Sequence, residues 1–205
     1  MIYTPDNEPY RGRQMVFQFD QTIQVAMEKN FLIAPWTHDR DLTLLQLAAT
    51  EIVPHGFSIA LSIRELIRQG YLLSAEILLR PLIERVAVLS YLCETPSALA
   101  LWEAGWPHKS RPSLSKMLAA MGPSEVGFDS KEMAQDATRY YNALIHADPS
   151  GSKRHMGNTT AGRRGYSASK SLSDTTKCDE ICREAFVYLY ILTARASQVF
   201  AEALK

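Results

Sequence analysis

The stretch DATRYYNALIHADPSGSKRH, residues 136–155, holds the side chains whose types and spacing point most directly to chemistry. Arg139 and His146 are seven positions apart, almost two turns of an α-helix, so both lie on nearly the same helix face. Asn142 lies four residues before His146, and its amide can orient the imidazole. The sequence therefore predicts a cation, an amide and an imidazole aligned along one helix of about residues 130–147.

Side chains of these kinds fit a reaction at phosphate. An imidazole can give or take a proton near neutral pH, and the negative end of the helix dipole favours its protonated form at His146. The guanidinium of Arg139 can hold two phosphate oxygens at once. Together they could serve attack of a ribose 2′-hydroxyl on the adjacent phosphate, with no metal required. The alternative is structural: a solvated surface arginine and a histidine satisfied at the helix end.

The segment that follows, residues 149–173, is rich in glycine, serine and threonine and contains no acidic residue. Glycines leave its backbone free, and an aromatic ring within it could stack on a base. A flexible cationic loop suits the phosphate backbone of RNA, although a loop of this composition can also be merely solvated and disordered. The candidate RNA-binding residues are Lys153, Arg154, Arg163, Arg164, Tyr166 and Lys170.

A second candidate pair lies in the apolar segment of residues 71–94. Arg80 and Glu84 have the i, i+4 spacing of a helical salt bridge. Burying either side chain without a partner would be costly, so a structural ion pair is the favoured interpretation, ahead of a direct catalytic role. Together with Tyr140, which directly follows the arginine of the first motif, they are the candidate supporting residues around the reactive groups.

Helical periodicity runs through almost the whole chain, and strand signals are scarce. The first expected helix covers residues 13–31, with an apolar stripe that runs from Met15 to Phe31, and a turn around Ala34–Trp36 closes it. The chain is therefore predicted to form an all-α bundle of about five or six helices.

The second expected helix covers residues 42–69. Asp39 or Asp41 could cap its start, and Pro54 predicts a kink or short break near Val53. Further helices are expected at about residues 71–94, 97–105, 113–121, 130–147 and 173–203.

The length of 205 residues and the 46% apolar content allow one good core, so we expect a single domain of residues 1–205. Its parts would be an N-terminal helix and turn (1–38), the bundle core with the motif helix (39–148), the basic loop (149–173) and a C-terminal helix (174–205). Lys and Arg balance Asp and Glu, 22 against 22, so any attraction to nucleic acid must come from local asymmetry.

The cysteine count of three argues against a disulfide framework and fits a reducing cytosol. Cys178 and Cys182 could form half of a metal site, but the sequence has no second pair at ligand spacing, so we expect neither a metal nor another cofactor. The longest apolar stretch, FVYLYILTA (186–194), is about half of what a bilayer span needs. A cytoplasmic protein without a membrane partner is expected.

An arginine followed after four to six residues by a histidine, late in an all-helical bundle, resembles the HEPN superfamily (higher eukaryotes and prokaryotes nucleotide-binding). The stretch SAEILLRPLIERVAVLSYL, residues 74–92, looks like the central helix of an uncharacterised bacterial branch, in which Arg, Glu four residues later and a final Tyr-Leu recur. Here these are Arg80, Glu84, Tyr91 and Leu92. The resemblance covers roughly residues 40–204 as an order of helices.

The resemblance implies a function. Many HEPN proteins are metal-independent endoribonucleases, often toxins or antiviral effectors, that act as homodimers with paired motifs at the two-fold axis. Arg139 would then bind phosphate, His146 would transfer the proton, and an antitoxin or another protein could be a partner. The family often has a small polar residue where this chain has Tyr140, and it also contains non-catalytic binding and dimerisation modules. The alternative function is therefore a helical module that binds a nucleotide or a protein.

Overall fold

The structure of the protein is a computed structural model that describes residues 2–107, 110–121, 131–146, 148, 157–158, 164–165 and 169–205. The fold is all-α, as the periodicity predicts. These ranges contain seven α-helices, one for each helical segment expected from the sequence, although the bundle was expected to have about five or six. Four are long: α1 (Gln14–His38), α2 (Leu44–Arg68), α3 (Leu72–Glu94) and α9 (Thr175–Val199). The shorter elements are η1 (Pro96–Ala98), α4 (Leu99–Glu103), α5 (Leu114–Ala120), α7 (Lys131–Ile145), η3 (Ala201–Leu204) and the antiparallel pair β1 (Gly157–Asn158) and β2 (Arg164–Gly165).

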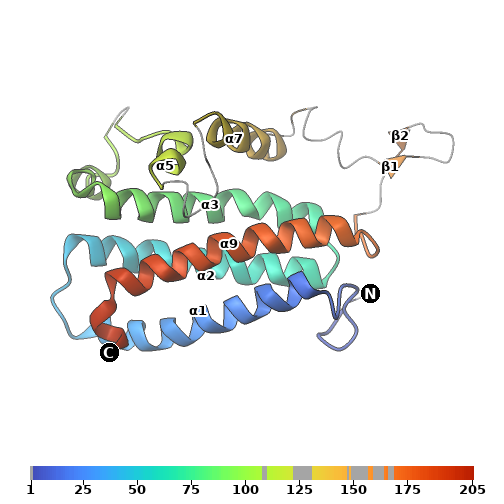
Figure 1. Cartoon of the computed structure of the whole chain (residues 1–205), viewed down its shortest axis with the longest axis horizontal. Helices are drawn as coiled ribbons and strands as arrows, with labels where there is room; N and C mark the ends of the chain where they lie inside the picture. The colour runs from blue at the N-terminus through green and yellow to red at the C-terminus, as the bar shows by residue number, and fades with distance from the viewer. Residues whose placement is uncertain are drawn as a thin grey trace.

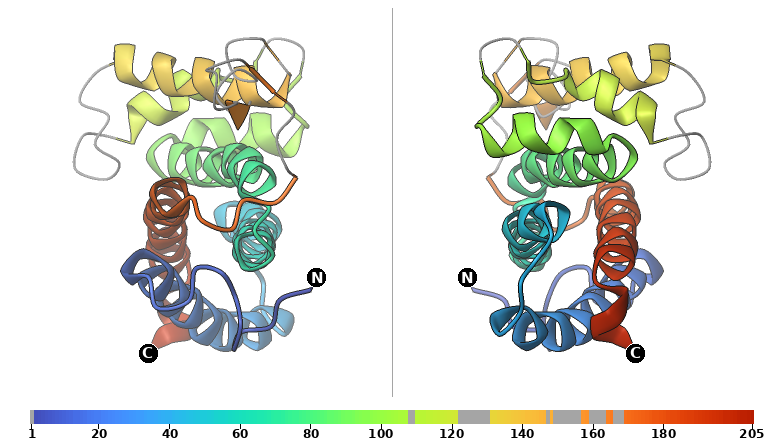
Figure 2. Two further views of the ribbon diagram at one scale, coloured as in Figure 1. Left: turned by 90° about the vertical axis from the view of Figure 1, so that its right-hand side faces the viewer. Right: turned by 90° about the vertical axis from the view of Figure 1, so that its left-hand side faces the viewer.

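The four long helices form a bundle, and α5 and α7 form a layer on top of it. In Figure 1, α1 lies at the bottom, α2 and α9 lie across the middle, and α3 separates them from α5 and α7. The two end views show α9 and α2 on opposite sides, between α1 and α3 (Figure 2). Helices α1, α2 and α3 alternate in direction, whereas α9 runs parallel to α3. The excursion over α5 and α7 makes this possible, because it returns the chain to the end of the bundle where α3 begins.

The core lies where α2, α3 and α9 meet. Ile63, Leu82, Leu89 and Leu192 are each fully buried there. Helices α2 and α9 approach closely at Gly56, where an added Cβ would lie 2.3 Å from Cδ2 of Leu192. Glycine at this position therefore lets the two helices pack closely.

The end of α1 corrects one prediction. The helix does not stop at a turn around Ala34–Trp36 but continues through Pro35 to His38. Proline removes a single backbone hydrogen bond, and here the carbonyl that loses it belongs to Phe31, whose side chain is 76% exposed. Water can satisfy that carbonyl, so the last turn survives. The expected apolar stripe is also wrong at Phe31, and Ile33 is buried instead.

The start of α2 corrects a second prediction. Neither Asp39 nor Asp41 caps it; the N-cap is Thr43, whose hydroxyl accepts a hydrogen bond from the backbone N–H of Gln46 at 3.3 Å. The Gln46 side chain accepts in return from the Thr43 N–H at 3.0 Å, which completes a capping box. The helix then runs without a break through Pro54 to Arg68, so the expected break near Val53 is absent.

The N-terminal segment is tied to the bundle by a buried arginine. The guanidinium of Arg64, on α2, donates two hydrogen bonds to the Glu8 carboxylate at 2.7 and 2.8 Å and also pairs with Asp20 of α1. These two carboxylates raise the pKa of Arg64 against the effect of its burial, which alone would lower it. The network fixes the loop before α1 against α1 and α2.

Helix α2 also meets a composition test for membrane spans. It has 25 residues, and its most apolar window has a mean hydropathy of 1.3. Buried residues of this helix, such as Ile52 and Ile67, pack in the bundle core. Core helices of soluble proteins meet the same test, so the match is weak evidence for a membrane location.

Candidate functional site

Helix α7 carries the predicted reactive residues, and its packing decides where they point. Ala134, Tyr141 and Leu144 are buried and lie on one face, because positions separated by seven and three residues share a side of a helix. This face rests on α3 and α5. The opposite face of α7 is directed to solvent, and the two flanks border the neighbouring helices.

Arg139 and His146 are both exposed. The Arg139 side chain is 77% exposed, and its Nη2 pairs with the Asp136 carboxylate one turn earlier at 2.6 Å. His146 follows the last residue of α7, and its backbone N–H donates to the Asn142 carbonyl at 3.0 Å. Their spacing predicts that both side chains lie on nearly the same face of one helix, and the exposure of both agrees with this. Of the two, His146 lines the cavity described next and Arg139 does not.

That cavity, which we call the α3–α7 cavity, has a volume of about 370 Å³ and opens to solvent. Four predicted residues meet there: Arg80 and Glu84 from α3, and Asn142 and His146 from α7. Arg139 and Tyr140 are not part of its wall. The remaining lining residues are apolar: Ile77, Leu78, Pro81 and Ile145.

Two arginines meet one carboxylate in the wall of the α3–α7 cavity. The predicted ion pair is confirmed, since Nη2 of Arg80 lies 3.3 Å from Oε1 of Glu84. A second guanidinium, from Arg111, lies 3.8 Å from the same oxygen. Burial lowers the pKa of Arg80; the charge of Glu84 opposes this shift and that of Arg111 adds to it. One carboxylate thus faces two permanent cations.

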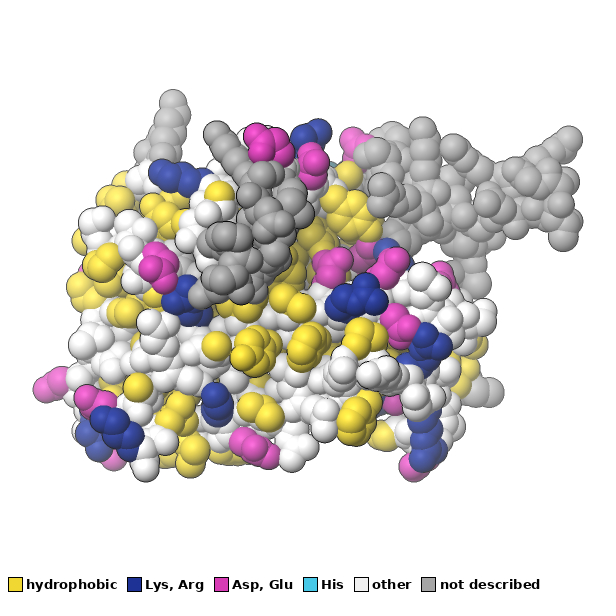
Figure 3. Space-filling model, in the orientation of Figure 1, with side chains coloured by type: hydrophobic (Ala, Val, Ile, Leu, Met, Phe, Trp, Pro, Cys, Tyr) yellow, Lys and Arg dark blue, Asp and Glu magenta, His cyan; other side chains and the backbone are white. Residues whose placement is uncertain are grey.

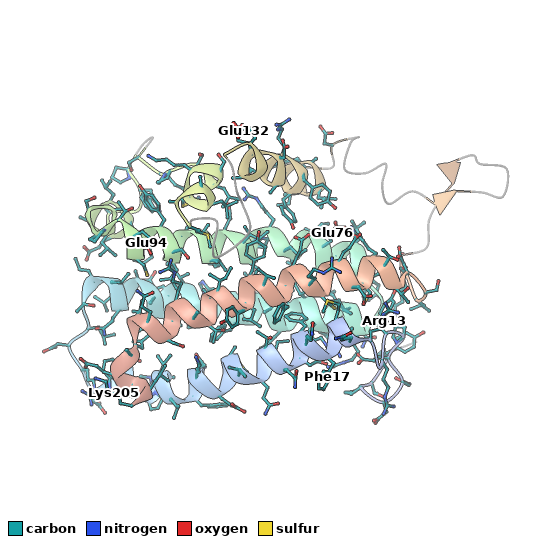
Figure 4. The ribbon with its side chains drawn as sticks, in the orientation of Figure 1. Arg13, Phe17, Glu76, Glu94, Glu132 and Lys205 are labelled. Atoms are coloured by element: carbon teal, nitrogen blue, oxygen red, sulfur yellow. The ribbon has the colours of Figure 1, made fainter. Side chains whose placement is uncertain are left out.

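Tyr140 lies on the other flank of α7, in a polar cluster that no sequence pattern indicated. Its hydroxyl donates to the carboxylate of Glu76, which is almost fully buried on α3 near the start of that helix (Figure 4). Lys177 of α9 donates to the same carboxylate at 2.6 Å. A cavity of about 300 Å³ lies here, and Glu180 and Glu184 of α9 also line it. Tyr140 therefore joins α7 to α3 and α9 and leaves Arg139 uncovered.

The pKa shifts in this polar cluster follow from burial and charge. Burial raises the pKa of the Glu184 carboxyl to about 7, and the negative charge of Glu76 contributes to the rise. Burial also raises the pKa of Tyr140, as does its hydrogen bond to Glu76. For Lys177, burial acts to lower the pKa, but the hydrogen bond to Glu76, the charge of Glu76 and the contact with Tyr140 together outweigh it, and the net shift is upward. Glu184 is thus a carboxyl that can exchange its proton near neutral pH.

Little of the predicted basic loop falls within the described part of the chain. Lys153, Arg154, Arg163 and Tyr166 lie outside the described residues, and for Arg164 only the backbone, in β2, is described. Lys170 is described, and its ammonium lies 4.8 Å from the ring centroid of Tyr71 and 5.4 Å from that of Tyr3. It rests against the start of α3 and not against the α3–α7 cavity.

Two other features contrast with the α3–α7 cavity. Among the described residues, no group of three or more His, Cys, Asp or Glu side chains could hold a metal, and Cys178 and Cys182 are fully buried in the core. A groove of about 410 Å³ between α1 and α9 is mostly apolar, with Val25, Phe186 and Tyr190 in its wall. Figure 3 shows apolar side chains gathered along this face. Lys29 also lines the groove, and its ammonium donates to the hydroxyl of Ser197 at 2.8 Å.

The fold and the site define an all-α bundle with a cavity between α3 and the added helix α7, lined on the α3 side by the Arg80–Glu84 ion pair. The model of a protein family of unknown function (DUF5677) matches residues 46–104, from the first turn of α2 to just past α4. No curated protein and no solved structure matches the chain. The matched segment includes Arg80 and Glu84 but ends before α7, so it contains only the α3 side of the cavity.

Proposed function

We propose that this protein is a HEPN-like endoribonuclease that cleaves RNA by 2′-hydroxyl transesterification without a metal, as a homodimer in the cytoplasm. The proposal includes a biological role: the protein would act in antiviral defence or as the toxin of a toxin–antitoxin pair, with an antitoxin as its partner. One observation supports it above the others. His146 and Asn142 reach from α7 into a solvent-open cavity whose opposite wall carries Arg80 and Glu84.

The chemistry requires a proton acceptor, a donor and positive charge near the scissile phosphate. His146 would take the proton of the ribose 2′-hydroxyl or return one to the leaving 5′-oxygen. Asn142, one turn earlier, would hold the imidazole or a phosphate oxygen in place. The new bond joins the 2′-oxygen to phosphorus and the bond to the 5′-oxygen breaks, which leaves a 2′,3′-cyclic phosphate and a 5′-hydroxyl.

Arg139 would act on the outer side of α7. Its exposed guanidinium can contact the RNA backbone beside the cavity, or meet the same face of a second copy. A symmetric dimer through this face would bring two copies of His146 to one axis. The basic loop of residues 149–173 would add attraction for the polyanion on sequence grounds.

Cleavage assays on a panel of single-stranded RNA oligonucleotides, with a chelator present, test the proposal. His146→Ala is expected to lower the cleavage rate by at least about 100-fold, the usual worth of a positioned acid or base. Arg139→Ala is expected to lower kcat/KM by about 10-fold or more, because it removes a charged hydrogen-bond donor. Product analysis should show cyclic phosphate ends.

Gln135→Ala is the matched control, because Gln135 lies exposed on the same helix and outside the cavity wall. It should cleave like the unchanged protein, and all variants should keep its melting temperature. Full cleavage by both His146→Ala and Arg139→Ala, or cleavage that stops when the chelator is added, would reject the proposal.

A second candidate function is a non-catalytic helical module that binds a nucleotide or a protein partner. The observation in its favour is that Arg139 lies outside the cavity and already pairs with Asp136. This candidate expects RNA or nucleotide binding without product. It is chosen over the nuclease if binding is saturable and no oligonucleotide in the panel is cut.

A further inference from the structure

The geometry points to Arg80, and not Arg139, as the residue that holds a phosphate group in the α3–α7 cavity, together with Asn142 and His146. This inference deepens the proposed function, because it assigns the anion-binding group of the same cavity. Phosphate binding can nevertheless be measured without any cleavage, so the two can fail separately.

The first observation is an unsatisfied donor. The Arg80 side chain is only 12% exposed, and its Nη1 is buried without a hydrogen-bond partner among the described residues. Buried donors in folded proteins are almost always paired, and leaving one unpaired costs about 1–3 kcal/mol. The guanidinium therefore keeps a hydrogen-bond donor beyond its ion pair with Glu84, and a rotation of the side chain toward the cavity would present this donor to an incoming oxyanion.

The second observation is the charge around it. Arg80 and Arg111 share the single carboxylate of Glu84, at 3.3 and 3.8 Å, so the group carries one net positive charge. His146, across the cavity, adds a ring nitrogen that can donate a hydrogen bond to an anion. A phosphate group with up to two negative charges matches this arrangement better than a carboxylate with one.

The third observation is the shape and lining. Pro81 has no N–H, so the carbonyl of Ile77 lacks its usual helical donor, and both residues line the cavity. This carbonyl can accept a hydrogen bond from a ligand hydroxyl. The volume of about 370 Å³ falls within the range of small-ligand sites. The cavity therefore has room for a phosphate together with the sugar that carries it.

Calorimetric titration with inorganic phosphate and with adenosine 3′-monophosphate tests the assignment. Arg80→Gln should weaken binding of both by about 10-fold or more, through loss of charged hydrogen bonds. Arg139→Gln is the matched control: it removes the same charge from the solvent face of α7 and should change the Kd by less than about twofold. Equal losses in the two variants, or an unchanged Kd for Arg80→Gln, would overturn the assignment.

Glu84→Gln separates a ligand site from a structural ion pair. With the competing carboxylate gone, Arg80 is free for the ligand, and phosphate should bind about threefold tighter or better. A purely structural pair predicts a lower melting temperature and no gain in affinity, and this result would overturn the inference. The variant also keeps the test valid should Arg80→Gln fail to fold.

A 2′-O-methylated dinucleotide, which cannot be cleaved, distinguishes the source of the phosphate. Arg80-dependent binding of adenosine 3′-monophosphate alone indicates a terminal phosphate, and binding of the dinucleotide indicates an internal linkage. Either result supports the site, and Arg80-independent binding of both overturns it.

The outcomes also separate this site from the nuclease proposal. Should phosphate bind as expected while RNA stays intact, the site stands and the nuclease proposal falls. Cleavage that depends on His146 but not on Arg80 would instead support the nuclease and overturn the assignment of Arg80.

Discussion

At the scale of single residues, the sequence shows reactive groups more readily than their partners. The i, i+4 pairing of Arg80 with Glu84 was predictable because helical spacing alone brings them together. Glu76 was not, because its partner Lys177 is 101 positions away and on another helix. Nor could the sequence show that Arg139 stays outside the cavity that His146 borders, since both share a helix side and only the neighbouring helix distinguishes them.

Glu184 gives a pH prediction at this scale. Its folded pKa is raised from 4.5 to about 7, so the folded protein holds this proton more tightly than the unfolded chain does. The contribution of Glu184 to the free energy of unfolding therefore falls as pH rises from about 4.5 to about 7, and is constant above that. Glutamine cannot lose a proton, so Glu184→Gln should not show this loss. Relative to the unchanged protein, the variant should therefore be more stable at pH 8 than it is at pH 5, by about 1–2 kcal/mol in the free energy of unfolding.

Urea denaturation of both proteins at pH 5 and pH 8 measures the effect. Glu180→Gln is the control, because Glu180 is exposed on the same helix and its replacement should leave the pH dependence unchanged. A stability difference between Glu184→Gln and the unchanged protein that is equal at the two pH values would contradict the burial of this carboxyl.

At the scale of helices, periodicity predicted each α-helix of the described ranges, while ends and proline effects were harder to predict. Whether Pro35 ends a helix depends on whether water can reach one carbonyl, which is a tertiary property. The N-cap of α2 was predictable, because Thr43 and Gln46 have the spacing of a capping box. The prediction chose Asp39 or Asp41 instead, because aspartate is also a common N-cap residue.

The contact between α2 and α9 gives a prediction at this scale. Gly56→Val should destabilise the protein by about 2 kcal/mol, because its new methyl groups would overlap Leu192 in a filled core. Ser58→Val, on the exposed side of the same helix, should change stability by less than about 0.5 kcal/mol. Chemical denaturation curves provide both values.

A double-mutant cycle links this cost to the contact itself. In a Leu192→Ala background, Gly56→Val should cost at least about 1 kcal/mol less, because the truncated side chain leaves room. Equal costs in both backgrounds would show that α2 and α9 are not held at this spacing by the glycine.

At the scale of the whole molecule, charge balance conceals a local excess. The chain has no net charge, yet residues 149–173 carry five Lys or Arg and no acidic residue. If this segment binds single-stranded RNA, replacing Lys153, Arg154, Arg163 and Arg164 by Gln should make the slope of log affinity against log salt shallower by about 3, at roughly 0.7 per phosphate contact. Fluorescence anisotropy at several salt concentrations gives the slope, and an unchanged slope would remove the loop from the RNA interface.

The parallel course of α3 and α9 has a consequence for biosynthesis. Residues 175–199 leave the ribosome after every segment that they cover, and they supply the Ile181, Ala185 and Leu189 side chains that fill the centre of the bundle. Until then the nascent α1–α3 hairpins expose an apolar seam to solvent, and chaperones that recognise such seams are expected to bind it. Ribosome-bound chains stalled before Thr175 should therefore be protease-sensitive and chaperone-associated, and chains extended past Lys205 by a linker that spans the exit tunnel should resist digestion.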